Sequence, residues 1–257
     1  MPLATSQGFG VAYERTGSGP PLLLLSGQSL GPGTWAGVRD DLAAHATVLL
    51  VHTRGTGDSR GPVTDGCSTE LFARDALAVL DHAGVGRAAV YGFSMGGRVA
   101  QVLAARSPDR VRRLVLGATG PGGAHEVSRA DAVTQVLRRS STDAGRRALA
   151  DLFFSPAFSA AHPALAAEFA PSAEGRWQRQ HHAASTAHDG WDLLPLITAP
   201  TLVLHGADDA MTPPGNADVL AARLPGARVH LVAGGRHGYL QEFRAEAGAV
   251  VAGFLRG

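Results

Sequence analysis

The chain has 257 residues, of which 45% are apolar and 18% are charged, and its formal net charge is +1. This length and composition suit one large α/β domain, or such a domain with a small insertion, and the near-neutral charge gives no electrostatic reason to expect nucleic acid or an anionic membrane as a partner. The single cysteine, Cys67, excludes an intramolecular disulfide and a multi-cysteine zinc site.

Two features of the sequence bear on where the protein acts. Residues 1–8 lack the basic start and the long apolar stretch of a signal peptide. The apolar run at 22–25 is far too short to span a bilayer. We therefore expect a cytoplasmic protein without a membrane partner, and the sequence gives no indication of its oligomeric state.

Short apolar runs alternate with helical patterns over the first 120 residues. The run at 9–13 alternates apolar and small residues and ends at a Gly-Ser-Gly-Pro break, which predicts a first, edge strand. The runs at 22–25 and 48–51 are apolar without alternation, as in strands that helices bury on both faces. The elements expected in this part are strands at 9–13, 22–25, 48–51, 88–92 and 111–116, and helices at 35–44, from an N-cap at Ser68 to Gly84, and from just after Ser94.

The pattern changes from about 121 to 191, where β-type runs vanish and helical spacing appears around 133–137 and 149–153. Further on, strands are expected at 201–204 and 228–232, and helices after 213–214 and at 245–255. Strands that alternate with helices predict an α/β fold with a mostly parallel, doubly wound sheet. We expect residues 1–120 and 191–257 to form this core and residues 121–190 to form a small helical cap over one edge of it.

Gly92, Ser94 and Gly96 fill the pattern G-x-S-x-G between an expected strand and an expected helix. In that sharp turn the serine hydroxyl stands clear of the sheet, and the first amides of the helix point to the same place. The sites of parallel sheets form beyond the carboxyl ends of the strands, so the loops after 25, 51 and 91 should gather near Ser94.

A serine hydroxyl becomes a strong nucleophile only when a base takes its proton and an acid orients the base. Two later strand ends supply the residues, because Asp208 and Asp209 follow 201–204 and His237 follows 228–232. Taken alone, the two aspartates are more typical of a turn that caps the next helix, and His237 of a surface histidine. The order Ser, Asp, His along the chain favours the catalytic interpretation and leaves both aspartates open.

Nearly the whole chain resembles the α/β-hydrolase fold family. The matching segments are Ser26-Gly27-Gln28, the Arg-Gly-Thr-Gly-Asp-Ser run at 54–59, the Gly-Phe-Ser-Met-Gly-Gly run at 92–97, Gly206 to Pro213, and Gly235-Arg236-His237. The chain departs from the family at two positions. Ser26 stands where the family usually has histidine, and His52 stands where it usually has aspartate.

The resemblance implies a role for each site residue. Ser94 would be the nucleophile, His237 the base and Asp209 the acid, because the family acid usually lies three residues after the glycine and four before the proline. The oxyanion hole would consist of the amides of Met95 and Gln28, and such donors contribute about 3–4 kcal/mol each in related mechanisms.

Within the family, the resemblance is greatest to 3-oxoadipate enol-lactonases, through Ser29-Leu30-Gly31, Trp35 and the run at 153–158. It implies a serine hydrolase that cleaves a small carboxylic ester or lactone without a cofactor. The alternatives are a non-hydrolytic or C–C bond-acting enzyme that uses the same pocket (a lyase, cyclase or acyltransferase) and a ligand-binding relative without catalysis. A carboxylate-bearing substrate would need a cation in the pocket, for which the cap offers Arg138, Arg139 and Arg179.

Among the remaining histidines, His52 and His205 are expected to be structural. His181, His182 and His188 resemble a ligand cluster, yet we expect no metal site, because a catalytic zinc needs three well-placed ligands and no acid or thiol lies at zinc-like spacing. His52 and His205 flank the loops of the expected site.

Overall fold

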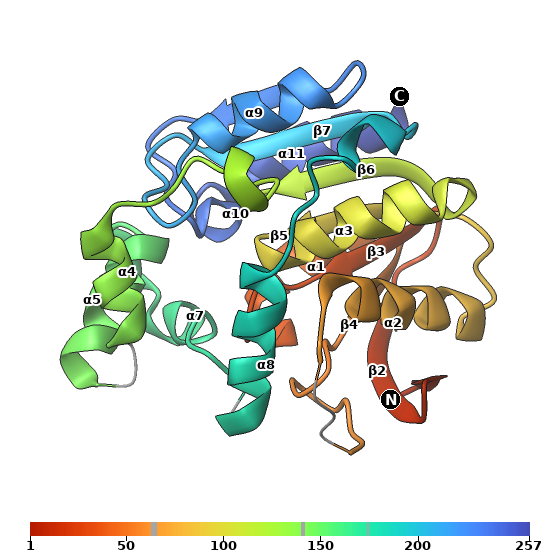
Figure 1. The fold of residues 1–257 in the computed structure, drawn as a ribbon, viewed down its shortest axis with the longest axis horizontal. Helices are drawn as coiled ribbons and strands as arrows, with labels where there is room; N and C mark the ends of the chain where they lie inside the picture. The colour runs from red at the N-terminus through yellow and green to blue at the C-terminus, as the bar shows by residue number, and fades with distance from the viewer. Residues whose placement is uncertain (63–65, 140–141, 174) are drawn as a thin grey trace.

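The computed structural model describes residues 1–62, 66–139, 142–173 and 175–257, and within them an eight-stranded sheet lies between two layers of helices (Figure 1). The spatial order of the strands is β1-β2-β4-β3-β5-β6-β7-β8. The pairs β1–β2 and β2–β4 are antiparallel, and every pair from β4 to β8 is parallel. The strands are β1 (Leu3–Ser6), β2 (Phe9–Thr16), β3 (Pro21–Leu25), β4 (Thr47–Val51), β5 (Ala88–Phe93), β6 (Val111–Gly117), β7 (Thr201–Gly206) and β8 (Arg228–Val232).

Helices cover both faces because the central strands are apolar on both sides. Leu23 and Leu25 of β3 belong to a core cluster that α2, α3 and α9 complete, whereas Leu22 and Leu24 belong to a second cluster with α1 and α11. The unbroken leucine run at 22–25 therefore fills two cores at once. The covering helices are α1 (Val38–Ala43), α2 (Thr69–His82), α3 (Met95–Arg106), α9 (Gly215–Arg223), α10 (Tyr239–Glu242) and α11 (Arg244–Arg256), with 3₁₀ turns η1 (Pro32–Trp35), η2 (Pro108–Arg110), η3 (Gly123–His125) and η4 (Leu194–Leu196).

The α2 helix begins where its sequence predicts. The hydroxyl of Ser68 accepts a hydrogen bond from the amide of Leu71 at 3.2 Å, which satisfies one of the free donors of the first turn. Gly84 follows the helix with a φ of +69°, a conformation that glycine adopts without strain.

The strand expected at 9–13 is present as β2, but the expectation that it lies at the edge of the sheet is wrong. β2 lies between β1 and β4, and the edge strand is β1. The turn between β1 and β2 consists of Gln7 and Gly8, both with positive φ, as in the short turns that fit the twist of a hairpin. The helix expected at 35–44 is also shorter than predicted. Gly37 has a φ of +74° and separates η1 from α1.

Between β6 and η4 the chain leaves the sheet and forms α4 (Asp131–Arg138), α5 (Asp143–Phe153), α6 (Pro156–Ala161), α7 (Pro163–Ala167) and α8 (Gly175–Thr186). Figure 1 shows α4, α5, α7 and α8 grouped at one end of the sheet. The described part of this insertion contains helices and turns but no named strand. Its exact boundaries as a cap, 121 and 190, stay a prediction. In the parts of the chain that the structure describes, no helix is long and apolar enough to cross a membrane.

A buried ion pair joins the loop after β4 to α2. Arg54 Nε lies 2.6 Å from Asp75 Oδ2, and Arg54 Nη2 lies 2.8 Å from Asp75 Oδ1 and 3.0 Å from the carbonyl oxygen of Ser6. The guanidinium also stacks over the ring of Phe9, 4.4 Å from its centroid. Both charged side chains are at least 96% buried, so each charge depends on the other for its neutralisation.

We expect Asp75→Ala to lower the free energy of unfolding by about 3–5 kcal/mol, since it leaves the Arg54 charge buried without its partner. The matched control is Asp81→Ala on the same helix, because Asp81 pairs with Arg110 while 66% of its side chain is exposed. That change should cost about 1 kcal/mol or less. Urea denaturation measures both, and equal losses would contradict the importance of the buried pair.

Candidate active site

Ser94 lies in the turn between β5 and α3 with a φ of +54° and a ψ of −120°. This is strained backbone geometry for a residue with a side chain. The surrounding chain leaves no room for larger neighbours, because a Cβ on Gly92 would lie 2.2 Å from the carbonyl oxygen of Gly96. A Cβ on Gly96 would lie 2.2 Å from the carbonyl oxygen of Leu25. The two glycines of the motif therefore allow β3, β5 and α3 to meet closely around Ser94.

The structure brings Ser94, His237 and Asp209 together from the ends of β5, β8 and β7. His237 Nε2 lies 3.1 Å from Ser94 Oγ, and His237 Nδ1 lies 2.7 Å from Asp209 Oδ2. His237 and Asp209 are 1% and 2% exposed, so water does not compete for the contact between them. With Asp209 ionised, Nδ1 donates to the carboxylate and Nε2 is free to accept the proton of Ser94.

Of the two adjacent aspartates, only Asp209 faces the histidine. Its Oδ1 accepts hydrogen bonds from the amides of Met211 and Thr212, both at 2.8 Å, and its Oδ2 also lies 3.3 Å from His205 Nε2. Asp208 is exposed. Burial raises the pKa of the Asp209 carboxyl, but the charge of His237 and the contacts with His205 and His237 outweigh it and lower the pKa to about 2.

Gln28 and Met95 line the same cavity as Ser94. Among the described residues, neither amide donates a hydrogen bond to a protein acceptor. Met95 is the first residue of α3, a helix of 12 residues whose dipole favours negative charge at this end. Both amides therefore remain free to donate a hydrogen bond to a bound group.

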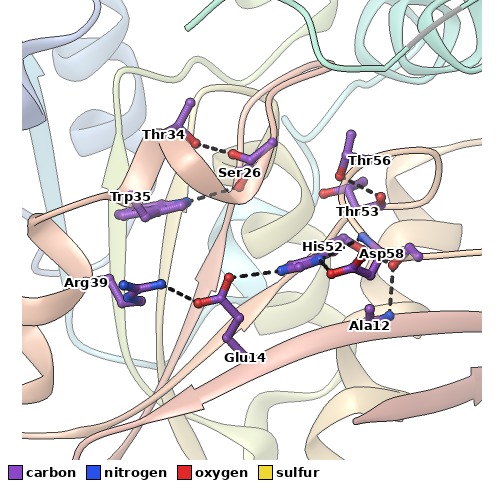
Figure 2. A network of polar contacts seen from close by, with 12 residues as sticks. Ala12, Glu14, Ser26, Thr34, Trp35, Arg39, His52, Thr53, Thr56 and Asp58 are labelled. Atoms are coloured by element: carbon purple, nitrogen blue, oxygen red, sulfur yellow. Dashed lines mark hydrogen bonds and ion pairs between the residues drawn. The ribbon is translucent and has the colours of Figure 1, made fainter. Parts of the chain in front are cut away.

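Both residues that depart from the family pattern have partners of their own (Figure 2). Ser26 Oγ accepts a hydrogen bond from Trp35 Nε1 at 3.1 Å. His52 is buried, with Nε2 3.3 Å from Glu14 Oε1 and Nδ1 accepting from the amide of Asp58 at 3.1 Å. These contacts secure the loops after β3 and β4 without the usual histidine and aspartate.

A cavity of about 1010 Å³ lies over Ser94, between the strand ends and the insertion. Its charged lining residues are Arg98, Arg129, Arg138, Arg179, Glu126 and Asp131. Of the three arginines that the sequence singled out, Arg138 and Arg179 line the cavity and Arg139 does not.

Sequence reasoning missed Arg98, which lies in the first turn of α3, four residues after Ser94. Its Nη2 contacts both carboxylate oxygens of Glu126 at 2.6 Å, and its Nη1 lies 3.3 Å from Ser185 Oγ. Burial, partly offset by Glu126, lowers the pKa of Arg98. The helical spacing from Ser94 is the signal that would have placed this arginine on the wall of the cavity.

The three histidines of the insertion do not come together as a metal site. His181 is buried against the loops after β3 and β4, and His188 lies between Thr69 Oγ1 (3.0 Å) and Gln101 Oε1 (3.4 Å). His182 is exposed and lines the cavity. Across the described ranges, no group of three or more histidine, cysteine or acidic residues is arranged to hold a metal ion.

Comparisons with known proteins define the class. The family model for the alpha/beta hydrolase fold matches residues 20–243, and the chain therefore belongs to the α/β-hydrolase fold family. Its relatives and structural neighbours are named hydrolases, and the protein is an α/β-hydrolase enzyme.

Three similar proteins cover almost the whole chain. A putative carbamate hydrolase, RutD, of Azorhizobium caulinodans is 32% identical over 246 residues, which is 93% of this chain and 92% of the relative. A 2-hydroxy-6-oxononadienedioate/2-hydroxy-6-oxononatrienedioate hydrolase of Burkholderia vietnamiensis is 30% identical over 96% of this chain and 91% of its own. The crystal structure of the enol-lactonase from Burkholderia xenovorans LB400 is similar with a TM-score of 0.84, 26% identity and coverage of 100% of both chains.

The low pKa of Asp209 makes a prediction for stability in acid. Because the folded pKa of about 2 lies below the ordinary 3.8, the stability that ionised Asp209 contributes is complete above about pH 4 and is lost as the pH falls toward about 2. As the pH falls through this range, the free energy of unfolding should decrease less for Asp209→Asn than for the wild type. Urea denaturation at a series of pH values measures this decrease for both proteins.

The matched control for this prediction is the exposed neighbour, in the variant Asp208→Asn, which should keep the wild-type pH dependence. Parallel curves for Asp209→Asn and the wild type would contradict the assignment.

Proposed function

We propose that the protein is a serine hydrolase that cleaves a small carboxylic ester or lactone through an acyl-enzyme on Ser94. The observation that carries the proposal is the continuous line of contacts from Asp209 through His237 to the Ser94 hydroxyl. Two further observations support it: Gln28 and Met95 line the same cavity as Ser94, and their amides have no protein acceptor among the described residues. A carbonyl attacked by Ser94 becomes an oxyanion that needs such donors.

Each step of the reaction has a residue to perform it. His237 Nε2 takes the proton of Ser94 as Oγ bonds to the substrate carbonyl carbon, and the amides of Gln28 and Met95 hold the oxyanion. The carbon–oxygen bond to the leaving alcohol then breaks, and His237 gives the alcohol its proton. A water molecule, deprotonated by His237, attacks the acyl carbon, and the acid departs as Ser94 regains its proton.

The same pocket could serve a lyase, a cyclase, an acyltransferase or a C–C bond hydrolase, since one fold hosts many chemistries. The ester and lactone assignment is favoured by the likeness to a protein named an enol-lactonase, which covers the whole of both chains.

The charged lining of the cavity supports an anionic substrate. Arg98 is neutralised by Glu126 at 2.6 Å. The other charged residues in the described lining are three arginines and one carboxylate: Arg129, Arg138, Arg179 and Asp131. An acyl group that carries its own carboxylate would therefore meet an excess of guanidinium groups.

We expect Ser94→Ala to lower kcat for p-nitrophenyl acetate by about 10⁴-fold or more, because the variant lacks the atom that forms the acyl bond. Circular dichroism and thermal unfolding should show that the variant is folded. Ser18→Ala, in an exposed loop, is the control and should match the wild type. Equal activity in Ser94→Ala and wild type would refute the assignment.

The charge of the cavity predicts the direction of substrate preference. An ester or lactone with a terminal carboxylate should show a kcat/KM about tenfold above that of its neutral methyl ester, and high salt should reduce this difference. Replacing Arg129, Arg138 and Arg179 together by glutamine should remove the preference, while Arg106→Gln, at the exposed end of α3, should leave it intact. A preference for the neutral substrate would contradict the prediction.

A further inference from the structure

The Gln28 amide belongs to a tight turn that closes when the amide of Leu30 donates to the carbonyl oxygen of Gly27 at 3.2 Å. Ser29 is the third residue of this turn and has a φ of +59°. Turns with positive φ at that position favour glycine, so a serine there is strained and persists only when its surroundings hold it.

The contacts that hold Ser29 come from the insertion. Its amide donates to His181 Nδ1 at 3.0 Å. Its carbonyl oxygen accepts from the amides of Ser172 at 2.7 Å and Ala173 at 3.2 Å. The backbone amide and the backbone carbonyl of the strained residue are therefore both bound by a part of the chain more than 140 residues away.

His181 is itself fixed on both sides. It lies on α8 and is fully buried, with its ring packed against Phe72 at a centroid distance of 5.2 Å. Nδ1 accepts from Ser29, so the ring proton is on Nε2, which donates to the carbonyl oxygen of Arg54 at 2.6 Å. Burial lowers the pKa of His181 to about 4, although the contact with Arg54 opposes this, and the ring is neutral near neutral pH. The neutral ring keeps the lone pair that Ser29 needs.

We propose that His181 is a positioning residue for the oxyanion hole: by accepting the Ser29 amide it holds the turn that directs the Gln28 amide toward the developing oxyanion. The inference rests on the proposed function, because the Gln28 amide matters only when Ser94 attacks a carbonyl. His181 is not among the residues that line the cavity, so it acts through its contact with Ser29 in the loop after β3.

The two ring contacts can be separated by two amide substitutions. In His181→Asn the side-chain oxygen takes the place of Nδ1 and keeps an acceptor for Ser29, whereas the contact with Arg54 is lost. In His181→Gln the side-chain nitrogen takes the place of Nε2 and keeps a donor for Arg54, whereas the contact with Ser29 is lost. The variants are matched in chemistry and burial, and they differ in which loop remains bound.

We expect His181→Gln to lower kcat for p-nitrophenyl acetate about tenfold or more with less than about a twofold change in KM, because a misdirected oxyanion donor affects the transition state more than the bound substrate. His181→Asn should keep kcat within about threefold of the wild type. The affinity for a trifluoromethyl ketone, whose adduct with Ser94 carries an oxyanion, should fall in parallel with kcat. His45→Ala, an exposed histidine, should resemble the wild type.

Equal kcat values for the Asn and Gln variants, with both folded, would overturn the role of His181 and leave the proposed function intact. If His181→Gln does not fold, His181→Asn decides alone: retention of kcat supports the inference, and a tenfold loss in the folded protein overturns it. Wild-type activity that is absent or independent of Ser94 overturns the proposed function and this inference together.

Discussion

The close crossing of β3, β5 and α3 is the constraint on which the site depends. Gly92 and Gly96 allow backbone atoms to approach where a methyl group would lie 2.2 Å from a carbonyl oxygen. A Cβ on Gly27 would likewise lie 3.2 Å from the Cβ of Ser94. This crossing forces Ser94 into its strained conformation and, in the same step, brings the loop after β3 beside the first turn of α3. One packing arrangement therefore positions the Ser94 hydroxyl, Met95 at the start of α3 and Gln28 in the loop after β3.

The insertion is bound to both halves of the candidate machinery. At the C-terminal end of α5, the carbonyl oxygens of Leu152 and Phe153 accept from the amides of His237 and Gly238 at 3.3 and 2.8 Å. The ring of Phe153 also packs on the imidazole of His237, with centroids 5.4 Å apart. On the other side, His181 of α8 accepts a hydrogen bond from Ser29 in the loop after β3. The helices over the cavity therefore also support the loops beneath it. A shift of the insertion would therefore move residues that contact His237 and residues that contact the loop after β3.

Much of this architecture follows from short-range patterns in the sequence. The unbroken apolar runs predicted the parallel strands, because such strands must be apolar on both faces, and G-x-S-x-G predicted the turn at Ser94. The sequence needed the family pattern to choose between Asp208 and Asp209. In the structure Asp209 is buried against His237, whereas Asp208 is exposed. β1 was missed because four residues with mixed polarity give no periodic signal. The contacts of Arg98 with Glu126 and of His181 with Ser29 were not predicted, because the partners lie 28 and 152 residues away in the sequence and helical periodicity does not specify them.

The central claim is that Ser94 carries the acyl group during turnover. Rapid quenching of the enzyme with p-nitrophenyl acetate, followed by mass spectrometry of the intact protein and of its peptides, tests this directly. We expect a species heavier by one acetyl group, with the modification on the peptide that contains Ser94, and we expect it to disappear as the substrate is exhausted. Steady turnover with no acylated protein, or with the acetyl group on another residue only, would contradict it.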